Sequence, residues 1–401
     1  MKNSFYYIRD GKMYRFDGVN SRQINSWVLD SYISKVKSRA EQNEWKYNGQ
    51  GAAFTGSAMP HVGASERVSS IFSRVNCVAE HNGNLLYSID IDSTNGIYRK
   101  SADSDSEGMV LCSSSTAYRS FDIKGDRLVA SAAFAGESHI GVLDFNTGRI
   151  DTYTEGHACD SWPVWSAVDS GKIYFCSAGL PENEKAALDD NAAPRGISQI
   201  VDEMYSSSSV RLGPSAICLL DINEGSLVEL LSDNSYDYTS PQSTSDGSLY
   251  YIRKPYKNNS GGNSFGCLAD IVMLPVRLFQ ALFGFLNVFS AKYSGKTLSR
   301  SDVKRKDEGQ MMIDGNLINA ERELKENQRR GDKNPGIIPR SWELRRLDGS
   351  GTDTLIRAGV LAYRVDESGE ILISNGSHIL RIDADGREER LLTADKVTFI
   401  K

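Results

Sequence analysis

Two stretches of the sequence resemble loops that bind phosphate or carry a catalytic serine. Residues 290–297, SAKYSGKT, differ from the nucleotide-binding motif G-x-x-x-x-G-K-[ST] only at the first position, where Ser290 replaces glycine. Residues 262–266, GNSFG, match G-x-S-x-G, the turn that exposes a nucleophilic serine in α/β-hydrolases. Both motifs need a strand of an α/β sheet before them and a helix after them. Their meaning therefore depends on the elements around them.

A third group of reactive residue types lies at His157, Cys159 and Asp160. A histidine beside a thiol could activate it as a nucleophile, but no orienting partner or oxyanion donor can be named from the sequence. Two further acids, Asp233 and Asp237, precede a similar segment, and with Asp160 they could give a ligand or cation site a negative potential. Zinc is not expected, because the five histidines form no H-x-x-x-H or H-E-x-x-H pair.

The elements that would position these residues follow a recurring pattern of strand, tight turn, strand, Asp-Gly turn and strand. Six units carry the pattern: 5–26, 85–114, 127–154, 172–179 resuming at 215–232, 248–256 resuming at 341–359, and 370–393. In one unit the third strand ends in Ser101. In the other five it ends in an aspartate: Asp17, Asp144, Asp221, Asp348 and Asp383. Such an aspartate can bond its own backbone, and a glycine after it accepts a positive φ. Self-similarity at about 40 residues is typical of propeller blades.

Each unit should be preceded by one more strand, the innermost of its blade. Five candidates precede the later units: 74–79, 118–123, 162–166, 239–244 and 360–365. The first unit has none, and residues 396–401, KVTFIK, could supply it from the other end of the chain. Pairing the last strand with the first blade removes two open sheet edges. The sequence therefore predicts an all-β fold, a single six-bladed β-propeller over residues 1–401 with 1+3 strand closure between the C- and N-termini.

Two of the units carry a more specific signature, P-x-W-S-x-D-G-x-x-I-x-F. The matching residues are Pro163, Trp165, Ser166, Gly171, Ile173 and Phe175 in one unit and Pro241, Ser243, Asp246, Gly247 and Leu249 in the next. Here the sequence resembles the TolB-like family of propellers, with its PD40 or WD40-like repeat. The resemblance implies the propeller fold. TolB-like proteins are periplasmic with an added N-terminal α/β domain, and similar propellers of prolyl oligopeptidases carry a hydrolase domain. We expect neither a leader nor such a domain here, and we expect a cytoplasmic protein.

Three helical or loop insertions interrupt the predicted strands, at residues 27–70, 180–212 and 257–340. The first should contain a helix with one apolar face, formed by Val28, Leu29, Tyr32, Ile33 and Val36. The second contains a short helix starting at a proline, within residues 194–205. The third comprises an apolar helix at about 275–291, a basic connector and a polar helix over 316–330.

The apolar helix of the third insertion has a face too wide to be left in water. Its apolar residues include Leu274, Leu278, Phe279, Leu282, Phe283, Phe285, Leu286 and Phe289. The helix is shorter than the roughly 20 residues that span a bilayer. Three kinds of surface could bury this face: the propeller itself or the other helix of the insertion, the groove of a partner protein, or a membrane surface. Basic residues up to Lys306 favour the last.

This organisation places both loop motifs outside an α/β sheet. The near-phosphate loop follows a predicted helix, and the G-x-S-x-G match lies in a Gly, Asn and Ser-rich linker, so we expect neither to work. The net charge of −6 predicts no nucleic-acid partner, although residues 257–340 hold 14 Lys and Arg against 9 Asp and Glu. The six cysteines have no regular spacing and are expected to be buried free thiols.

We therefore predict a non-enzymatic scaffold without a cofactor, which presents its insertions, chiefly 257–340, to a protein partner. Two alternatives remain. One is a site for a small ligand or cation, or a hydrolase site, at the channel mouth near His157–Asp160. The other is a peripheral membrane protein anchored by residues 268–306.

Overall fold

A computed structural model describes most of the chain as two compact units. The described residues are 4–42, 73–91, 94–101, 106–134, 136–179, 212–256, 310–313 and 316–401. Unit 1 comprises Met1–Ile24, Arg74–Leu268 and Gly309–Lys401, and unit 2 comprises Asn25–Ser73 and Ala269–Glu308.

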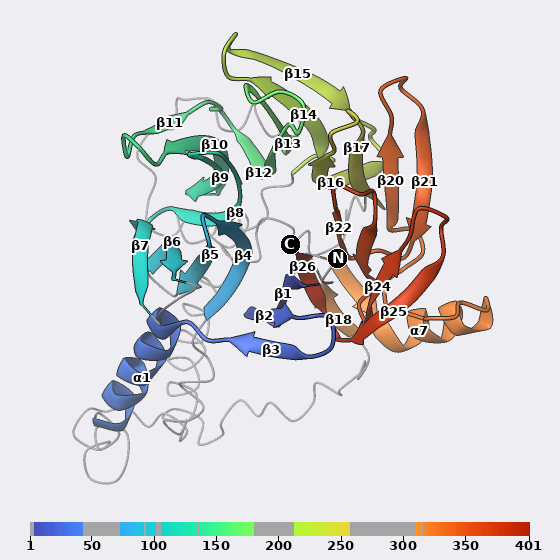
Figure 1. Ribbon diagram of the computed structural model, residues 1–401, viewed down its shortest axis with the longest axis horizontal. Helices are drawn as coiled ribbons and strands as arrows, with labels where there is room; N and C mark the ends of the chain where they lie inside the picture. The colour runs from blue at the N-terminus through green and yellow to red at the C-terminus, as the bar shows by residue number, and fades with distance from the viewer. Residues whose placement is uncertain are drawn as a thin grey trace, which may run out of the picture. The chain divides into compact units, whose positions relative to one another are not determined.

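Unit 1 consists mostly of antiparallel strands (Figure 1). Four of its sheets have four strands each, in the orders β26-β1-β2-β3, β4-β5-β6-β7, β16-β17-β20-β21 and β22-β23-β24-β25. Their bounds are β26 Val397–Ile400, β1 Phe5–Arg9, β2 Lys12–Phe16, β3 Ser21–Ile24, β4 Ser73–His81, β5 Asn84–Ile91, β6 Thr94–Lys100, β7 Glu107–Ser113, β16 Tyr236–Ser243, β17 Leu249–Pro255, β20 Glu343–Leu347, β21 Asp353–Ala358, β22 Ala362–Val365, β23 Ile371–Ser374, β24 His378–Ile382 and β25 Glu388–Thr393. The strands begin and end close to the positions that the repeat pattern predicts.

One further sheet has eight strands, made of two antiparallel runs of four. The first run is β8 Ala117–Lys124, β9 Arg127–Phe134, β10 Glu137–Asp144 and β11 Ile150–Thr152; the second is β12 Ala158–Trp165, β13 Lys172–Gly179, β14 Ala216–Asp221 and β15 Ser226–Leu231. A single parallel pair, Ser138 with Cys159, joins β10 to β12. Each run therefore has the same strand order as the separate four-stranded sheets.

The core lies between the faces of consecutive runs, because alternate residues of each strand point to opposite faces. For example, Ile97 of β6 and Leu128 of β9 belong to one buried cluster, and Ile140 of β10 and Ile173 of β13 to the next. Ile252 of β17 packs in a cluster with Ile373 of β23. The apolar alternation of the sequence thus produces sheets that cover one another face to face.

The first and last strands of unit 1 are joined by backbone hydrogen bonds. Ile8 of β1 lies opposite Phe399 of β26, and Tyr7 lies opposite Ile400. Beyond the strand, the amide of Tyr6 donates to the carbonyl of Lys401 at 2.7 Å, and the amide of Lys401 donates back at 2.8 Å. The sheet that contains the chain's first strands is therefore completed by residues from its far end.

The aspartates that follow the third strands form the turns by accepting backbone hydrogen bonds. In Asp17, Asp144, Asp221, Asp348 and Asp383, Oδ1 accepts N–H groups two to four residues onward at 2.7–3.1 Å. The hydrogen bond from Thr147 is the main reason that the pKa of Asp144 lies below its ordinary value. These short self-contained turns let each third strand reverse into the fourth.

The last part of the third insertion differs from the prediction. The expected helix over 316–330 begins only at Ala320: Asn316–Asn319 is strand β19, which pairs with β18, Gln310–Ile313, and helix α7 spans Ala320–Arg329. Asn319 ends the strand and caps the helix, because its Oδ1 accepts the amide of Arg322 at 3.0 Å. The returning chain then joins the core, where Ile338 packs beside Trp342 and Leu361.

The described part of unit 2 contains helix α1, Trp27–Gln42. The five apolar residues predicted to share a face of this helix are all half-buried, whereas Trp27 is 65 % exposed. The short helix of the second insertion and the apolar helix of the third lie outside the described residues. Across the described ranges, no helix is long and apolar enough to cross a membrane.

The cysteines match the expectation of free thiols with one exception in burial. Cys77, Cys159, Cys176 and Cys218 are free and buried, whereas Cys112 is free and exposed. Cys112 lies on β7, the outermost strand of its sheet, where one face meets solvent. Cys267 lies outside the described residues.

Asn327 offers a test of how firmly the returning segment is held. Its Nδ2 donates to the carbonyls of Gly336 at 2.8 Å and Ile338 at 3.2 Å, and the residue is only 4 % exposed. Asn327→Ala leaves buried carbonyls unsatisfied, and we expect it to lower the free energy of unfolding by about 2 kcal/mol in urea titrations. The exposed neighbour Gln328→Ala should change it by less than about 0.5 kcal/mol. Equal losses for the two variants would contradict this assignment.

Asp246 should make part of the folding stability depend on pH. Hydrogen bonds from Thr244 and Ser248, and the charge of Arg346, lower its pKa from 3.8 to about 2. Because the folded value is the lower one, the stabilisation is complete above pH 3.8 and is lost as the pH falls toward 2. Asp246→Asn should therefore be less stable than the parent protein at pH 6, and thermal melts should show the gap closing below about pH 4. A stability difference between the two proteins that stays constant with pH would contradict the lowered pKa of Asp246.

Candidate functional site

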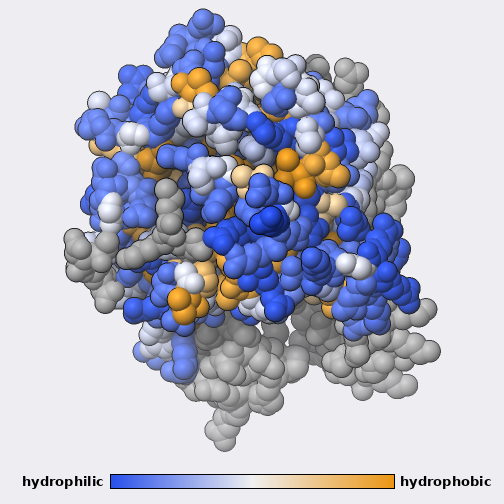
Figure 2. Space-filling view, turned by 45° about the vertical axis from the view of Figure 1, so that its right-hand side comes forward, coloured by the Kyte–Doolittle hydropathy of each residue, from blue (hydrophilic) through white to orange (hydrophobic). Residues whose placement is uncertain are grey.

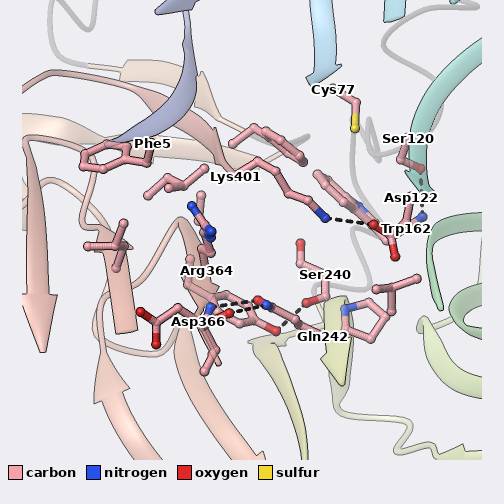
Figure 3. Close-up of a pocket in the computed structure, with 18 of the residues that line it drawn as sticks. Phe5, Cys77, Ser120, Asp122, Trp162, Ser240, Gln242, Arg364, Asp366 and Lys401 are labelled. Atoms are coloured by element: carbon pink, nitrogen blue, oxygen red, sulfur yellow. Dashed lines mark hydrogen bonds and ion pairs between the residues drawn. The ribbon is translucent and has the colours of Figure 1, made fainter. Parts of the chain in front are cut away.

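A cavity of about 500 Å³ opens in unit 1, between the innermost strands of the sheets (Figure 3). Residues of β4, β8, β12, β16, β22 and β26 all contribute to its wall. The volume falls within the range of about 300–1,000 Å³ that is usual for small-molecule sites. All six strands come from unit 1, so the wall is formed by one compact body.

Two of the cavity strands are bent by bulges at non-glycine residues in the left-handed region. Trp162 has φ 53° and Ser240 has φ 54°, and the pairing register of each strand shifts there. Each residue precedes a proline of the repeat signature, Pro163 or Pro241, which has no N–H to pair. A bulge re-aims the side chains of a strand, and both prolines line the cavity.

Polar side chains on the cavity wall join two pairs of neighbouring innermost strands, β8 with β12 and β16 with β22. Asp122 Oδ2 of β8 accepts the amide of Trp165 of β12 at 3.0 Å. Gln242 of β16 makes a double contact, because Nε2 donates to the carbonyl of Val365 at 2.6 Å and Oε1 accepts its amide at 2.9 Å. Figure 3 shows the Gln242 contact beside Ser240. These strands lack a backbone ladder between them, so the side chains provide the pairing.

Two cations reach into the cavity, and their surroundings differ. Lys401 Nζ donates to Asp122 Oδ1 at 2.8 Å; burial lowers the pKa of Lys401, but the carboxylate more than offsets this, so the pKa is raised. Arg364 makes no hydrogen bond or ion pair with any residue that the structure describes. Burial lowers the pKa of Arg364, and the acids Asp366 and Glu80 compensate only in part. The guanidinium is thus a partly buried charge without a direct partner.

The structure gives the reactive group at 157–160 other surroundings. His157 is exposed, with Nδ1 2.5 Å from Oε1 of Glu137. The Cys159 thiol is buried and donates to the carbonyl of Gly136 at 3.3 Å. Asp160 is 3 % exposed and accepts the hydroxyl of Thr154, and its burial raises the pKa of the carboxyl.

The other two acids stabilise backbone near the start of β16. Asp233 is exposed and its Oδ1 accepts the amide of Ser235 at 2.7 Å, while Asp237 Oδ1 accepts the amide of Ser215 at 3.0 Å. Neither these acids nor His157, Cys159 and Asp160 are among the residues that line the cavity. Over the described ranges, no three His, Cys, Asp or Glu side chains are grouped so as to hold a metal ion. The two loop motifs and the apolar residues Leu274–Phe289 lie outside the described residues.

The polar residues of the cavity wall belong to none of the sequence motifs considered above. Asp122, Gln242 and Arg364 each lie in a segment that was recognised as an innermost strand. A charge or amide within a strand that must be buried on both faces is the signal that could have found them, because such a group needs a partner inside the protein.

No protein-family model matches the chain, and no curated protein matches it. Solved structures are similar to it. TolB from Acinetobacter baumannii has a TM-score of 0.47 and 9% sequence identity, and the match covers 99% of this chain and 65% of that chain. A chain of a nidogen–laminin complex has a TM-score of 0.43 and 8% identity, with 99% of this chain and 97% of that chain covered. An oligogalacturonate lyase from Vibrio parahaemolyticus has a TM-score of 0.38 and 10% identity, with 81% of this chain and 80% of that chain covered. This chain thus spans less than two thirds of the length of that TolB. The structures found include the TolB-like propellers whose repeat the sequence resembles.

The double contact of Gln242 can be tested with a side chain of the same size. In Gln242→Glu a carboxylate oxygen replaces the donor that faces the carbonyl of Val365. We expect this change to cost about 1–3 kcal/mol of unfolding free energy at pH 7. The loss should shrink toward pH 4, because a protonated glutamate can again donate. Urea titrations at the two pH values measure this, and a loss that does not depend on pH would contradict it.

Proposed function

We propose that this chain is a six-bladed β-propeller with 1+3 closure, and that it acts as a non-enzymatic scaffold for a partner protein. The count of six rests on the four separate four-stranded sheets and on the two runs of the eight-stranded sheet. The closure rests on the pairing of β26 with β1.

The contacts between the runs support a closed ring, because they follow one another in a cycle. Cys77 of β4 donates to the carbonyl of Phe121 of β8, and β8 contacts β12 through Asp122. The run of β12 and β13 contacts β16 in a buried cluster that contains Cys176 and Tyr238. Gln242 then joins β16 to β22, and a cluster that contains Ala362 and Val397 joins β22 to β26. The cycle returns through Val75 of β4, whose amide donates to the carbonyl of Gly11 between β1 and β2 at 2.8 Å.

The observation that carries the scaffold proposal is that the long excursions leave such a ring at one end. The innermost strands run parallel, as the order of the Ser120–Trp162 and Asp122–Trp165 contacts supports. Second and fourth strands then all finish at the same end. The chain leaves unit 1 after β3, a fourth strand, and enters the ranges 180–211 and 257–309 after β13 and β17, both second strands. The opposite end carries the short aspartate turns.

A ring with one end of short turns and one end of long excursions has a single face on which to present a recognition segment. Loops placed by a rigid scaffold commonly carry binding function. The apolar residues Leu274–Phe289 are the segment that we propose for the partner, through an amphipathic helix laid in its groove. The described free thiols fit the reducing cytoplasm that we propose as its location.

Surface and site chemistry also support a binding role over a catalytic one. The face in Figure 2 is largely hydrophilic, with apolar residues in small separate groups, so it offers no broad apolar surface of its own. The Cys159 thiol and the Asp160 carboxyl are both engaged and buried, whereas a Cys–His pair needs its thiol accessible to substrate.

Deletion of the proposed recognition segment tests the proposal. Residues 260–308 are replaced by a short Gly-Ser linker, which keeps β18, β19 and α7. We expect a folded ring by circular dichroism and an unchanged melting temperature to within a few degrees, but loss of the protein that the parent chain captures in crosslinked pull-downs. Replacing 181–210 with the same linker is the matched control, and it should keep the capture.

Two results would overturn the scaffold proposal. One is the capture of the same proteins by the chain without 260–308. The other is a segment-dependent pelleting with vesicles of anionic lipid in the absence of any captured protein, which would assign the segment to a membrane.

A further inference from the structure

We propose that the central cavity is a binding site for a small anion, a carboxylate or phosphate group that the Arg364 guanidinium and the Lys401 ammonium hold together. The inference is independent of the scaffold proposal, since it concerns the ring itself and none of the insertions.

The first observation is that Arg364 lacks the carboxylate partner that other partly buried arginines of unit 1 have. Arg345 donates to Asp353 and Glu343, and Arg381 donates to Glu389. Arg364 extends from β22 into the cavity below Lys401 (Figure 3). An ionised group removed from water is costly unless something compensates it. A bound anion would supply that compensation.

The second observation is that Lys401 keeps free N–H donors in the cavity, while Asp122 and Asp366, two acids of its wall, already accept other hydrogen bonds. Lys401 uses one of its three N–H donors on Asp122, so two remain for a ligand. Asp122 is itself occupied, because it also accepts the amide of Trp165. Asp366 is satisfied within its own turn, where Oδ1 accepts the amides of Ser368 and Glu370 at 2.9 Å.

The remaining charged residues of the wall do not cancel Arg364. Oε1 of Glu370 lies 4.0 Å from a guanidinium nitrogen of Arg381, with which it forms a long ion pair, and Glu367 is exposed. Neither Glu370 nor Glu367 makes an ion pair with Arg364 in the part of the chain that the structure describes. The cavity therefore holds a guanidinium that has no direct partner among the described residues, although Asp366 and Glu80 offset part of its charge without contacting it.

The chemistry of the donors fixes the class of ligand. A guanidinium offers a planar fork that matches the two oxygens of a carboxylate or phosphate, and an ammonium beside it adds a second contact. The rings of Trp162 and Phe399 stack on the same wall, with their centroids 6.4 Å apart and their planes at 14°. They give the carbon skeleton of a ligand an apolar surface. A metabolite-sized anion suits a cavity of about 500 Å³.

Titrations of the full chain with two probes test the site. Succinate and inorganic phosphate are added separately, with sodium chloride at the same ionic strength as reference, and binding is followed by thermal shift and isothermal calorimetry. We expect saturable binding of at least one probe and a raised melting temperature. Arg364→Gln should weaken that binding at least tenfold, whereas Arg381→Gln, which removes a paired arginine of the same wall, should keep it within about twofold.

The outcomes separate the two sources of the anionic group. Binding of succinate alone assigns the site to carboxylates, and binding of phosphate alone assigns it to phosphorylated compounds; either supports the proposal. It is overturned if neither probe exceeds chloride, or if Arg364→Gln binds as well as the parent chain.

A second variant guards against a folding artefact. Arg364→Lys keeps the charge but loses the planar fork, so it should fold and bind more weakly than the parent chain. Because Arg364 has no protein partner, Arg364→Gln without ligand should be at least as stable as the parent. If both variants failed to fold, Arg364 would be a structural residue and the proposal would be wrong.

Discussion

The backbone pairing between β26 and β1 is the contact on which the rest of unit 1 depends. Hydrogen bonds between Tyr6 and Lys401, and the register of Ile8 with Phe399, complete a sheet whose strands come from opposite ends of the chain. The same pairing brings Phe399 and Lys401 to the cavity wall. A local event between two short strands thus determines both the completeness of a sheet and the chemistry at its centre.

Between the runs, stability has two sources that act at different distances from the cavity. Away from it, apolar side chains of adjacent faces are buried together, as Ile140 and Ile173 are. Beside it, the strands draw apart, and polar side chains such as Asp122 and Gln242 satisfy backbone groups that no ladder reaches. The polar wall is therefore part of what joins the sheets, and Arg364 differs from Asp122 and Gln242 because it has no direct partner among the described residues.

Much of this architecture could be predicted from the sequence, because strand alternation and Asp-Gly turns are local signals. The innermost strands appear as β4, β8, β12, β16 and β22 within a few residues of the predicted ranges. The helix expected from residue 316 begins at 320 because pairing of Asn316–Asn319 with β18, a tertiary contact, prevails over local helix propensity. The free thiols were expected, but not the exposure of Cys112 on an edge strand.

The candidate site was less accessible to prediction, since it depends on which face of a strand each residue occupies. The bulges at Trp162 and Ser240 shift the alternation by a residue, so counting along the strand gives the wrong face. Attention to reactive residue types favoured His157 and Asp160, whereas the cavity is lined by Asp122, Gln242 and Arg364.

The late position of β26 in the sequence has a consequence for biosynthesis. On the ribosome, residues 5–24 emerge long before residues 397–400, and until then β1, β2 and β3 lack the strand that completes their sheet. During that interval the uncovered edge of β1 can pair with a strand of another chain. The time that β1 spends without β26 should therefore determine how much the protein depends on a chaperone.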